Sequence, residues 1–239
     1  MCIDPAGNES ADPLIELALE EDLAGRGALT SQATIPADLT ATVKVVARES
    51  GSLSGAALIS RIYEALGDRW SLPACEVSLL LEDGATLAPG AVIARVTGPV
   101  QALLCGERTA LNFLIHLSGI ASLTSEFVRR AEGTQAVILD TRKTLPGYRQ
   151  LHKYAVRCGG GVNHRMGLYD GVLIKDNHLA ACSGRSVAAA VLAAREYLTR
   201  ESLNLPVEVE VDTLDQLQDV LTVQPDIVLL DNMKTSELQ

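Results

Sequence analysis

The stretch Val207-Glu208-Val209-Glu210-Val211-Asp212 alternates valines with carboxylates at a strict period of two. Successive side chains of a β-strand point to opposite faces, so the valines share one face and the carboxylates share the other. On an antiparallel edge the carboxylates would face water. In an α/β barrel the valines would pack against helices and the carboxylates would point inward, where they need cations, a metal ion or hydroxyl groups as partners.

Apolar runs and helical patterns alternate on both sides of this strand. The predicted strands cover residues 136–139, 171–174, 207–211 and 227–230, and the predicted helices cover residues 147–158, 185–200 and 213–222. This order implies βα units and a parallel sheet. The G-x-G-x-x-G and G-x-x-x-x-G-K-[ST] motifs are absent, so we favour a barrel over an open dinucleotide-binding sheet.

The N-terminal part of the chain mixes helix and strand patterns. We expect helices at residues 13–22 and 54–67 and strands at residues 40–48 and within 76–97. A long helix is predicted to begin at Gly106, because apolar residues recur every three or four positions to residue 131. We therefore place two domains, at residues 1–105 and 106–239.

Composition excludes several functional classes. With 47% hydrophobic and 21% charged residues the chain can form a packed core. A net charge of −10 argues against nucleic acid or an anionic membrane as a partner. No apolar run reaches the roughly 18–20 residues of a membrane helix, and no secretory signal begins the chain. The five cysteines include no C-x-x-C pair, so we expect a reducing, cytoplasmic location.

Charged residues lie at or directly after the end of each predicted strand, and in the third strand also within it. The clusters are Asp140–Thr144, Lys175–His178, the carboxylates Glu208, Glu210 and Asp212, and Asp231–Asn232. The carboxyl ends of barrel strands form active sites. Seven basic and three acidic residues, a net charge of +4, lie between Asp140 and His178, which predicts a small and highly anionic ligand.

Some residues near these clusters have simpler interpretations. Arg149, Lys153 and Arg157 are spaced by four, and we expect them to line the exposed face of a helix. The glycines at 159–161 can provide tight, positive-φ backbone beside a ligand, or only a helix cap and loop. His164 beside Arg165 could donate to an anion, but a lone histidine is more often structural.

The sequence resembles quinolinate phosphoribosyltransferase, the family also called nicotinate-nucleotide pyrophosphorylase (carboxylating). The matching segments run in the family's order over nearly the whole chain. They are Glu21-Asp22-Leu23 through Leu29-Thr30-Ser31, Gly106–Asn112, Asp140–Thr144 with Pro146-Gly147, Gly160–Arg165, Leu173–His178, Val207–Asp212 and Leu230–Asn232. Gly27-Ala28-Leu29-Thr30 departs from the family's Gly-Asp-Leu-Thr.

The resemblance implies an N-terminal α/β open-faced sandwich followed by an α/β barrel of the TIM type. The family continues with further βα units and a glycine-rich phosphate-binding stretch, whereas this chain stops at Gln239, shortly after the strand ending at Leu230. The sequence therefore predicts an incomplete barrel, truncated at its C-terminus, with an unpaired sheet edge. Full activity of the 239-residue chain is a weaker expectation than membership of the family.

The resemblance also implies roles for individual residues. Quinolinate carboxylates and nearby phosphate oxygens would be held by Arg108, Arg142, His164, Arg165 and Lys175. Thr141 and Lys143 would share that surface, and Lys143, Glu210 and Asp231 would be catalytic. Glu210 and Asp231 would hold the ribose hydroxyls and Mg²⁺, directly or indirectly, since hard oxygen ligands suit that ion.

The implied reaction joins quinolinate to phosphoribosyl pyrophosphate in de novo NAD biosynthesis, giving nicotinate mononucleotide, pyrophosphate and CO₂. A homodimer is implied, in which Arg108 enters the neighbouring active site. Three alternatives stay open at this point. They are a molybdenum-transport-associated phosphoribosyltransferase with another acceptor, a Schiff-base lyase that uses Lys175, and a non-catalytic remnant that pairs with an intact partner.

Overall fold

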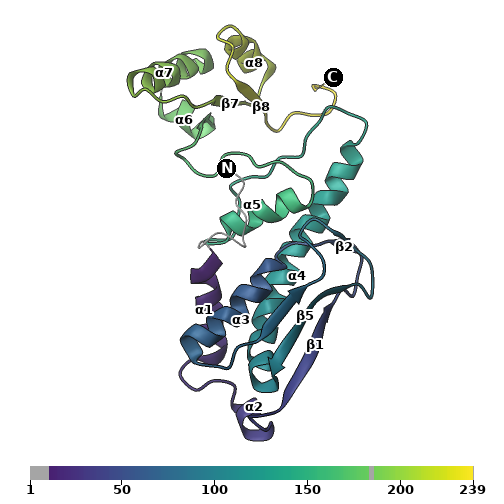
Figure 1. The fold of residues 1–239 in the computed structure, drawn as a ribbon. Coiled ribbons are helices and arrows are strands. Elements are labelled where there is room, and N and C mark those ends of the chain that lie inside the picture. The colour runs from purple at the N-terminus through teal and green to yellow at the C-terminus, as the bar shows by residue number, and fades with distance from the viewer. Residues whose placement is uncertain (1–10, 183–185, 239) are drawn as a thin grey trace. The chain divides into compact units, whose positions relative to one another are not determined.

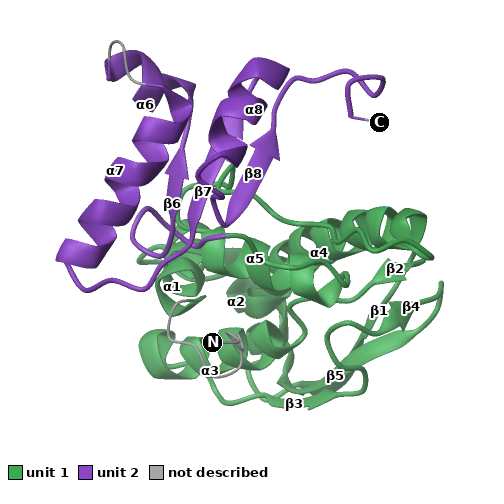
Figure 2. Cartoon of the chain, turned by 90° about the horizontal axis from the view of Figure 1, so that it is seen from above, with its two compact units in different colours: residues 1–164 green, residues 165–239 purple. Residues whose placement is uncertain are grey.

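The computed structural model describes residues 11–182 and 186–238, which leaves Cys2 outside the described residues. The chain divides into two compact units, residues 1–164 and 165–239 (Figure 2). Each unit has its own hydrophobic core. The predicted domain boundary between residues 105 and 106 falls inside a helix, whereas the compact units divide directly after His164.

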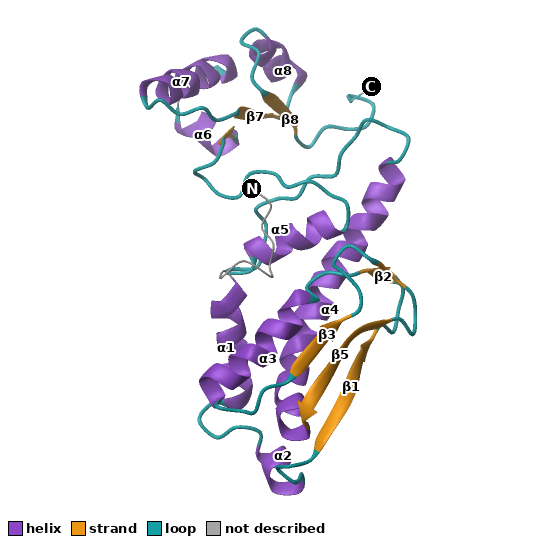
Figure 3. Cartoon of the chain, in the orientation of Figure 1, coloured by secondary structure: helices purple, strands orange, loops and turns teal. Residues whose placement is uncertain are grey.

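The first unit contains a three-stranded antiparallel sheet in the order β1-β5-β3 (Figures 1 and 3). The strands are β1 (Thr40–Val46), β3 (Glu76–Leu79) and β5 (Val92–Pro99). Their alternation places Ala94 and Val96 of β5 in the core, while Arg95 is exposed. The short strands β2 (Gly51–Ser52) and β4 (Thr86–Leu87) form a second antiparallel pair.

Helices supply the rest of this core. They are α1 (Asp12–Leu23), α2 (Leu29–Thr34), α3 (Ala57–Trp70), α4 (Val100–Ala131) and α5 (Arg149–Cys158). In α1 and α3 the apolar residues at helical spacing, among them Ile15, Leu19, Ile59 and Ile62, are at most 1% exposed. The predicted helices at 13–22 and 54–67 and the strand at 40–48 are thus present with slightly shifted ends.

Helix α4 begins at Val100, six residues before the predicted start at Gly106. Pro99 precedes it, and proline's fixed φ is compatible with the residue before a helix. Leu117 and Ala121 are fully buried, as the apolar spacing predicts, whereas Phe127, nearer the end of the helix, is 49% exposed. Among the described residues α4 alone has the length and composition of a membrane span, a test that the core helix of a soluble protein also passes.

The predicted strand at residues 136–139 is reduced to a single parallel bridge between Leu139 and Val162. Two backbone hydrogen bonds support it: Asp140 N–H donates to the Val162 carbonyl at 3.1 Å, and Val162 N–H donates to the Ile138 carbonyl at 2.8 Å. The partner segment, after Gly161, was not recognisable as a strand from the sequence.

The second unit contains a parallel sheet in the order β6-β7-β8, flanked by helices (Figure 3). Its elements are β6 (Val172–Ile174), α6 (Asp176–Ala181), α7 (Val187–Arg200), β7 (Val207–Val211), α8 (Leu214–Leu221) and β8 (Ile227–Leu230). A sheet unit followed by an α/β unit with parallel strands confirms the predicted fold class. Helix α6 is an addition that the sequence analysis did not predict.

The alternation in β7 has the predicted consequence. Val207, Val209 and Val211 are at most 1% exposed and belong to the core of this unit. Glu208 and Glu210, on the opposite face, are also buried, each 7% exposed. The strand is therefore covered on both faces, which is typical of parallel sheets.

Candidate functional site

In the first unit, the segment after Asp140 carries three predicted site residues. Thr141 and Lys143 are exposed and Arg142 is half-buried. The Lys143 N–H donates to the Thr141 hydroxyl at 3.0 Å, so the segment has a defined turn. The Nε of Arg142 is buried and no described residue accepts a hydrogen bond from it. An anionic ligand could supply that acceptor.

His164 lies beside this segment because Leu139 and Val162, shortly before the two sets of residues, form a parallel bridge. Its N–H donates to Asp140 Oδ1 at 2.9 Å, and its side chain is half-buried. Because this bridge is parallel, the two segments that follow Leu139 and Val162 leave it in the same direction. The structure therefore brings Thr141, Arg142 and Lys143 together with His164.

The largest correction concerns Lys153 of α5. We expected it on an exposed helix face, but its side chain is 1% exposed and forms an ion pair with Asp140. Arg149 and Arg157 are not free surface residues either. Arg149 Nε donates to the Thr144 hydroxyl at 3.3 Å, and Arg157 donates to Asn163 Oδ1 at 2.7 Å. Each of the three basic residues contacts residues 140–144 or 163–164, the two segments that contain the predicted site residues.

The glycines after α5 are explained mainly by packing. A Cβ on Gly159 would lie 2.3 Å from the Ala121 carbonyl oxygen of α4, and one on Gly161 would lie 2.7 Å from a Val156 methyl group. Gly160 has a φ of +85°, which favours glycine. The backbone thus turns tightly against α4 and returns to the strand at Val162.

Arg108 lies apart from these residues in the chain, on the exposed face of α4. No described residue forms an ion pair or hydrogen bond that engages its side chain. Thr109, the next residue, is buried and its hydroxyl donates to Asp22 at 3.4 Å. Arg108 therefore presents an unpartnered guanidinium group on the surface of the first unit, as far as the described residues go.

In the second unit, the strand ends bring Lys175 and Glu210 together. Lys175 follows β6, Glu210 lies in β7, and their side chains form an ion pair. Helix α6 begins directly after Lys175, and the Lys175 N–H donates to His178 Nδ1 at 2.9 Å. This confirms that an inward carboxylate of β7 has a cationic partner.

Asp231 and Arg165 complete the predicted set in this unit. The Asp231 N–H donates to the Val211 carbonyl at 3.0 Å, which places Asp231 at the carboxyl end of the sheet. Its side chain accepts a hydrogen bond from Asn232 at 2.8 Å. Arg165 donates to the Gly171 carbonyl at 2.9 Å, just before β6 begins.

Burial excludes two nearby groups as nucleophiles. Burial raises the pKa of the Cys158 thiol at the end of α5, so it stays protonated at neutral pH. Burial, together with the Asp83 carboxylate that accepts its hydrogen bond at 2.8 Å, raises the pKa of Tyr154. Both side chains are therefore protonated at neutral pH.

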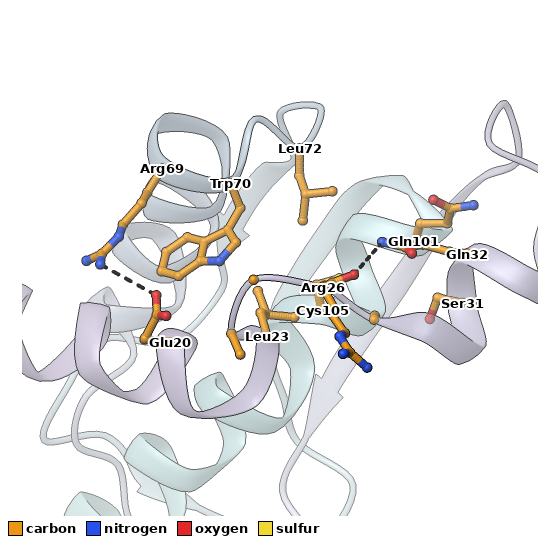
Figure 4. Close-up of a pocket in the computed structure, with 14 residues that line it drawn as sticks. Glu20, Leu23, Arg26, Ser31, Gln32, Arg69, Trp70, Leu72, Gln101 and Cys105 are labelled. Atoms are coloured by element: carbon orange, nitrogen blue, oxygen red, sulfur yellow. Dashed lines mark hydrogen bonds and ion pairs between the residues drawn. The ribbon is translucent and has the colours of Figure 1, made fainter.

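A separate cavity of about 440 Å³ lies beside α1 and the loop that follows it (Figure 4). Arg69 pairs with Glu20 at 3.5 Å near its wall, and Gln32 donates to the Arg26 carbonyl at 3.3 Å. None of the predicted site residues lines this cavity. It is therefore distinct from the strand-end residues described above.

Sequence reasoning missed Lys153 and Asn163 as parts of this arrangement. Asn163 Nδ2 donates to Asp140 Oδ2 at 2.6 Å and to the Lys153 carbonyl at 2.8 Å. The nearest signal was the run Gly160–Arg165, which carries the family resemblance but does not say which of its residues face inward. The burial of a lysine leaves no mark in a single sequence, since lysine is usually exposed.

Two family models match the chain. The model described as "Quinolinate phosphoribosyl transferase, C-terminal domain" matches residues 120–239. The model described as "Quinolinate phosphoribosyl transferase, N-terminal domain" matches residues 28–118.

Individual relatives agree with the family models. The chain is 44% identical to a nicotinate-nucleotide pyrophosphorylase [carboxylating] of Mycobacterium leprae, over 97% of this chain and 78% of that protein. It is 44% identical to a probable enzyme of the same name from Bacillus subtilis, over 89% of this chain and 69% of that protein. The solved nicotinate-nucleotide pyrophosphorylase of Francisella tularensis aligns with a TM-score of 0.88 at 35% identity, over 99% of this chain and 79% of that chain.

Proposed function

Because the chain belongs to the quinolinate phosphoribosyltransferase family, we propose that it transfers phosphoribose from phosphoribosyl pyrophosphate to quinolinate. The products are nicotinate mononucleotide, pyrophosphate and CO₂, as in de novo NAD biosynthesis. The observation that carries this proposal is the cationic segment Thr141–Lys143, held beside His164 at one strand edge with the Arg142 Nε lacking a described acceptor. Both reactants are highly anionic and need such a surface.

The basic residues bind the anionic groups of the reactants. Quinolinate carboxylates and neighbouring phosphate oxygens are contacted by Arg108, Arg142, His164, Arg165 and Lys175. Thr141 and Lys143 extend the same surface, and the Lys143 ammonium stabilises the leaving pyrophosphate. Arginine suits carboxylates because its planar fork can donate two parallel hydrogen bonds.

The acidic residues act on the ribose. Positive charge develops on the ring as pyrophosphate leaves C1′, and the Glu210 and Asp231 carboxylates favour that charge. They also accept hydrogen bonds from the ribose hydroxyls. Glu210 is pre-positioned by Lys175, so binding of the substrate exchanges part of an existing ion pair for contacts with the ligand.

The residues fit a magnesium ion for which the phosphates of the substrate, rather than the protein, would supply most of the ligands. No group of three or more His, Cys, Asp or Glu that could hold a metal occurs among the residues that the structure describes. Mg²⁺ commonly uses one or two carboxylates together with substrate phosphates and waters. Asp231 and Glu210 would supply those carboxylates, and the ion would neutralise charge on the pyrophosphate.

Decarboxylation follows from the chemistry of the product. The ring nitrogen becomes cationic on glycosylation. When CO₂ leaves, the electrons of the broken C–C bond stay on C2, where the adjacent positive charge stabilises them, and C2 then takes a proton from water, so no residue need form a covalent bond. The Schiff-base alternative is not favoured, because the Lys175 amine is engaged by Glu210, whereas a lysine nucleophile must be neutral and free.

We further propose a cytoplasmic homodimer. Arg108 lies on an exposed helix face without a described partner, so it could enter the site of a neighbouring subunit. Analytical ultracentrifugation at several concentrations tests the dimer. If Arg108 acts across subunits, mixing Arg108→Ala and Glu210→Ala proteins restores activity, because the mixed dimer keeps one intact site.

Turnover tests the reaction itself. Purified protein is given phosphoribosyl pyrophosphate and Mg²⁺ with either quinolinate or nicotinate, and nicotinate mononucleotide and CO₂ are measured. We expect turnover with quinolinate only. Turnover of nicotinate without quinolinate would reject the substrate, and binding of neither reactant in calorimetry would indicate a non-catalytic chain.

A further inference from the structure

A fully buried lysine lies directly behind the cationic segment of the first unit. The side chain of Lys153 is 1% exposed and that of Asp140 is 6% exposed, and the two form an ion pair. Leu151 and Ala155 of the same helix are buried with it. Desolvation offsets much of the attraction in a buried pair, so stability alone is a weak reason for such a pair.

The pair holds both backbone polar groups of one residue. Asp140 Oδ1 accepts the His164 N–H at 2.9 Å, and Lys153 Nζ donates to the His164 carbonyl at 2.8 Å. Asn163 closes the arrangement, since its Nδ2 donates to Asp140 Oδ2 and its Oδ1 accepts from Arg157. We call Asp140, Lys153 and Asn163 the buried clamp.

The buried clamp lies next to the parallel bridge, at the start of the two segments that contain the proposed binding residues. Thr141–Lys143 follow Asp140 immediately, and His164 follows Asn163. Among the described residues, a single bridge, at Leu139 and Val162, connects the two segments. A single bridge constrains the relative position of the two segments only weakly. Side-chain hydrogen bonds must therefore fix their spacing. A lysine suits this task because one ammonium can donate to a carboxylate and to a carbonyl at once.

We propose that Lys153 is a positioning residue, which acts through Asp140 and the His164 backbone to fix the spacing between Thr141–Lys143 and His164. It does so without touching the reactants. The inference rests on the proposed function, because it assigns a role to Lys153 in binding quinolinate through residues that contact it.

Steady-state kinetics of Lys153→Met test this role. Methionine fills a similar volume but donates no hydrogen bond. We expect kcat/KM for quinolinate to fall by about 10²-fold, since displacement of a binding group by about 1 Å can cost that much. The KM for quinolinate should rise, because Arg142 and His164 would no longer meet its carboxylates at the correct spacing. Lys44→Met, at an exposed position of β1, is the matched control and should behave as the wild type.

A second variant separates positioning from folding. Lys153→Met with Asp140→Asn removes both buried charges, so it should fold even if the single variant does not. The His164 carbonyl still lacks its donor, and the KM for quinolinate should stay raised. A wild-type KM in either folded variant would overturn the inference. Failure of both variants to fold would assign the buried clamp to folding alone and would also overturn it.

Amide hydrogen exchange gives a readout that needs no turnover. Peptides covering residues 141–143 and 164 should exchange at least about tenfold faster in folded Lys153→Met than in the wild type, since protection reports local opening. Unchanged exchange would refute the positioning role. Wild-type protein that fails to turn over quinolinate would instead refute the proposed function, so the two failures are distinguishable.

Discussion

The two ion pairs at strand ends differ in the exposure of their lysines. The carboxylates are alike, since the side chains of Asp140 and Glu210 are 6% and 7% exposed. The Lys153 side chain is 1% exposed, whereas that of Lys175 is 40% exposed. A ligand in solution can reach Lys175 and compete for it, but it cannot reach Lys153. The first pair is therefore suited to holding backbone in place, and the second to exchanging partners with a substrate.

The largest effect should come from breaking each pair at its carboxylate. Asp140→Ala leaves the Lys153 ammonium buried without a counter-ion, and we expect the free energy of unfolding to fall by about 3–5 kcal/mol. Glu210→Ala leaves an ammonium that water can reach, and the loss from that ion pair should stay below about 1 kcal/mol. Urea unfolding followed by circular dichroism measures both.

Asp38→Ala, at an exposed position, serves as the control for the aspartate change. It should alter the unfolding free energy by no more than about 0.5 kcal/mol. Equal losses in Asp140→Ala and Glu210→Ala would contradict the distinction between a holding pair and an exchangeable pair.

A smaller effect is expected when a cationic side chain of the proposed site is replaced by another cation, and this effect is on the affinity for quinolinate. Arg142→Lys keeps the charge and loses the planar fork, so quinolinate affinity should fall roughly tenfold or more, about 1.5–3 kcal/mol for a charge-assisted contact. Calorimetry with quinolinate measures this directly. Arg95→Lys, on the exposed face of β5, is the matched control. Unchanged affinity in Arg142→Lys would remove Arg142 from the site.

Local periodicity made much of the fold predictable. The valine alternation in β7 and the helical spacing of α7 and α8 are properties of a few neighbouring residues, and each of these elements lies within a few residues of its predicted place. The start of α4 at Val100 was harder, because Gly106 was taken for a boundary and instead packs against Tyr63 within the helix.

The candidate site was predictable only where residues stand directly after strands. Lys175 and Glu210 fit that pattern, and their ion pair follows from strand pairing in the parallel sheet. Lys153 was misplaced because its spacing from Arg149 and Arg157 is that of an exposed helix face. Its burial depends on Asp140, thirteen residues earlier, which becomes its neighbour only through tertiary packing.

The smallest effect is a loss in the free energy of unfolding at acidic pH, which we expect to arise from a histidine pair in the first unit. His116 and His152 place their Nε2 atoms 2.7 Å apart between α4 and α5, so one ring donates and the other accepts. Burial, and secondarily the neighbouring His116, lowers the pKa of His152. In the unfolded chain the pKa of histidine is about 6.5. Near and below that pH the unfolded chain therefore binds more protons than the folded protein, and the free energy of unfolding must fall as the pH drops. His152→Gln keeps a polar partner without titrating, so it should lose less stability between pH 7.5 and pH 5 than the wild type does in urea unfolding. An equal loss in the wild type and in His152→Gln would show that the histidine pair does not contribute.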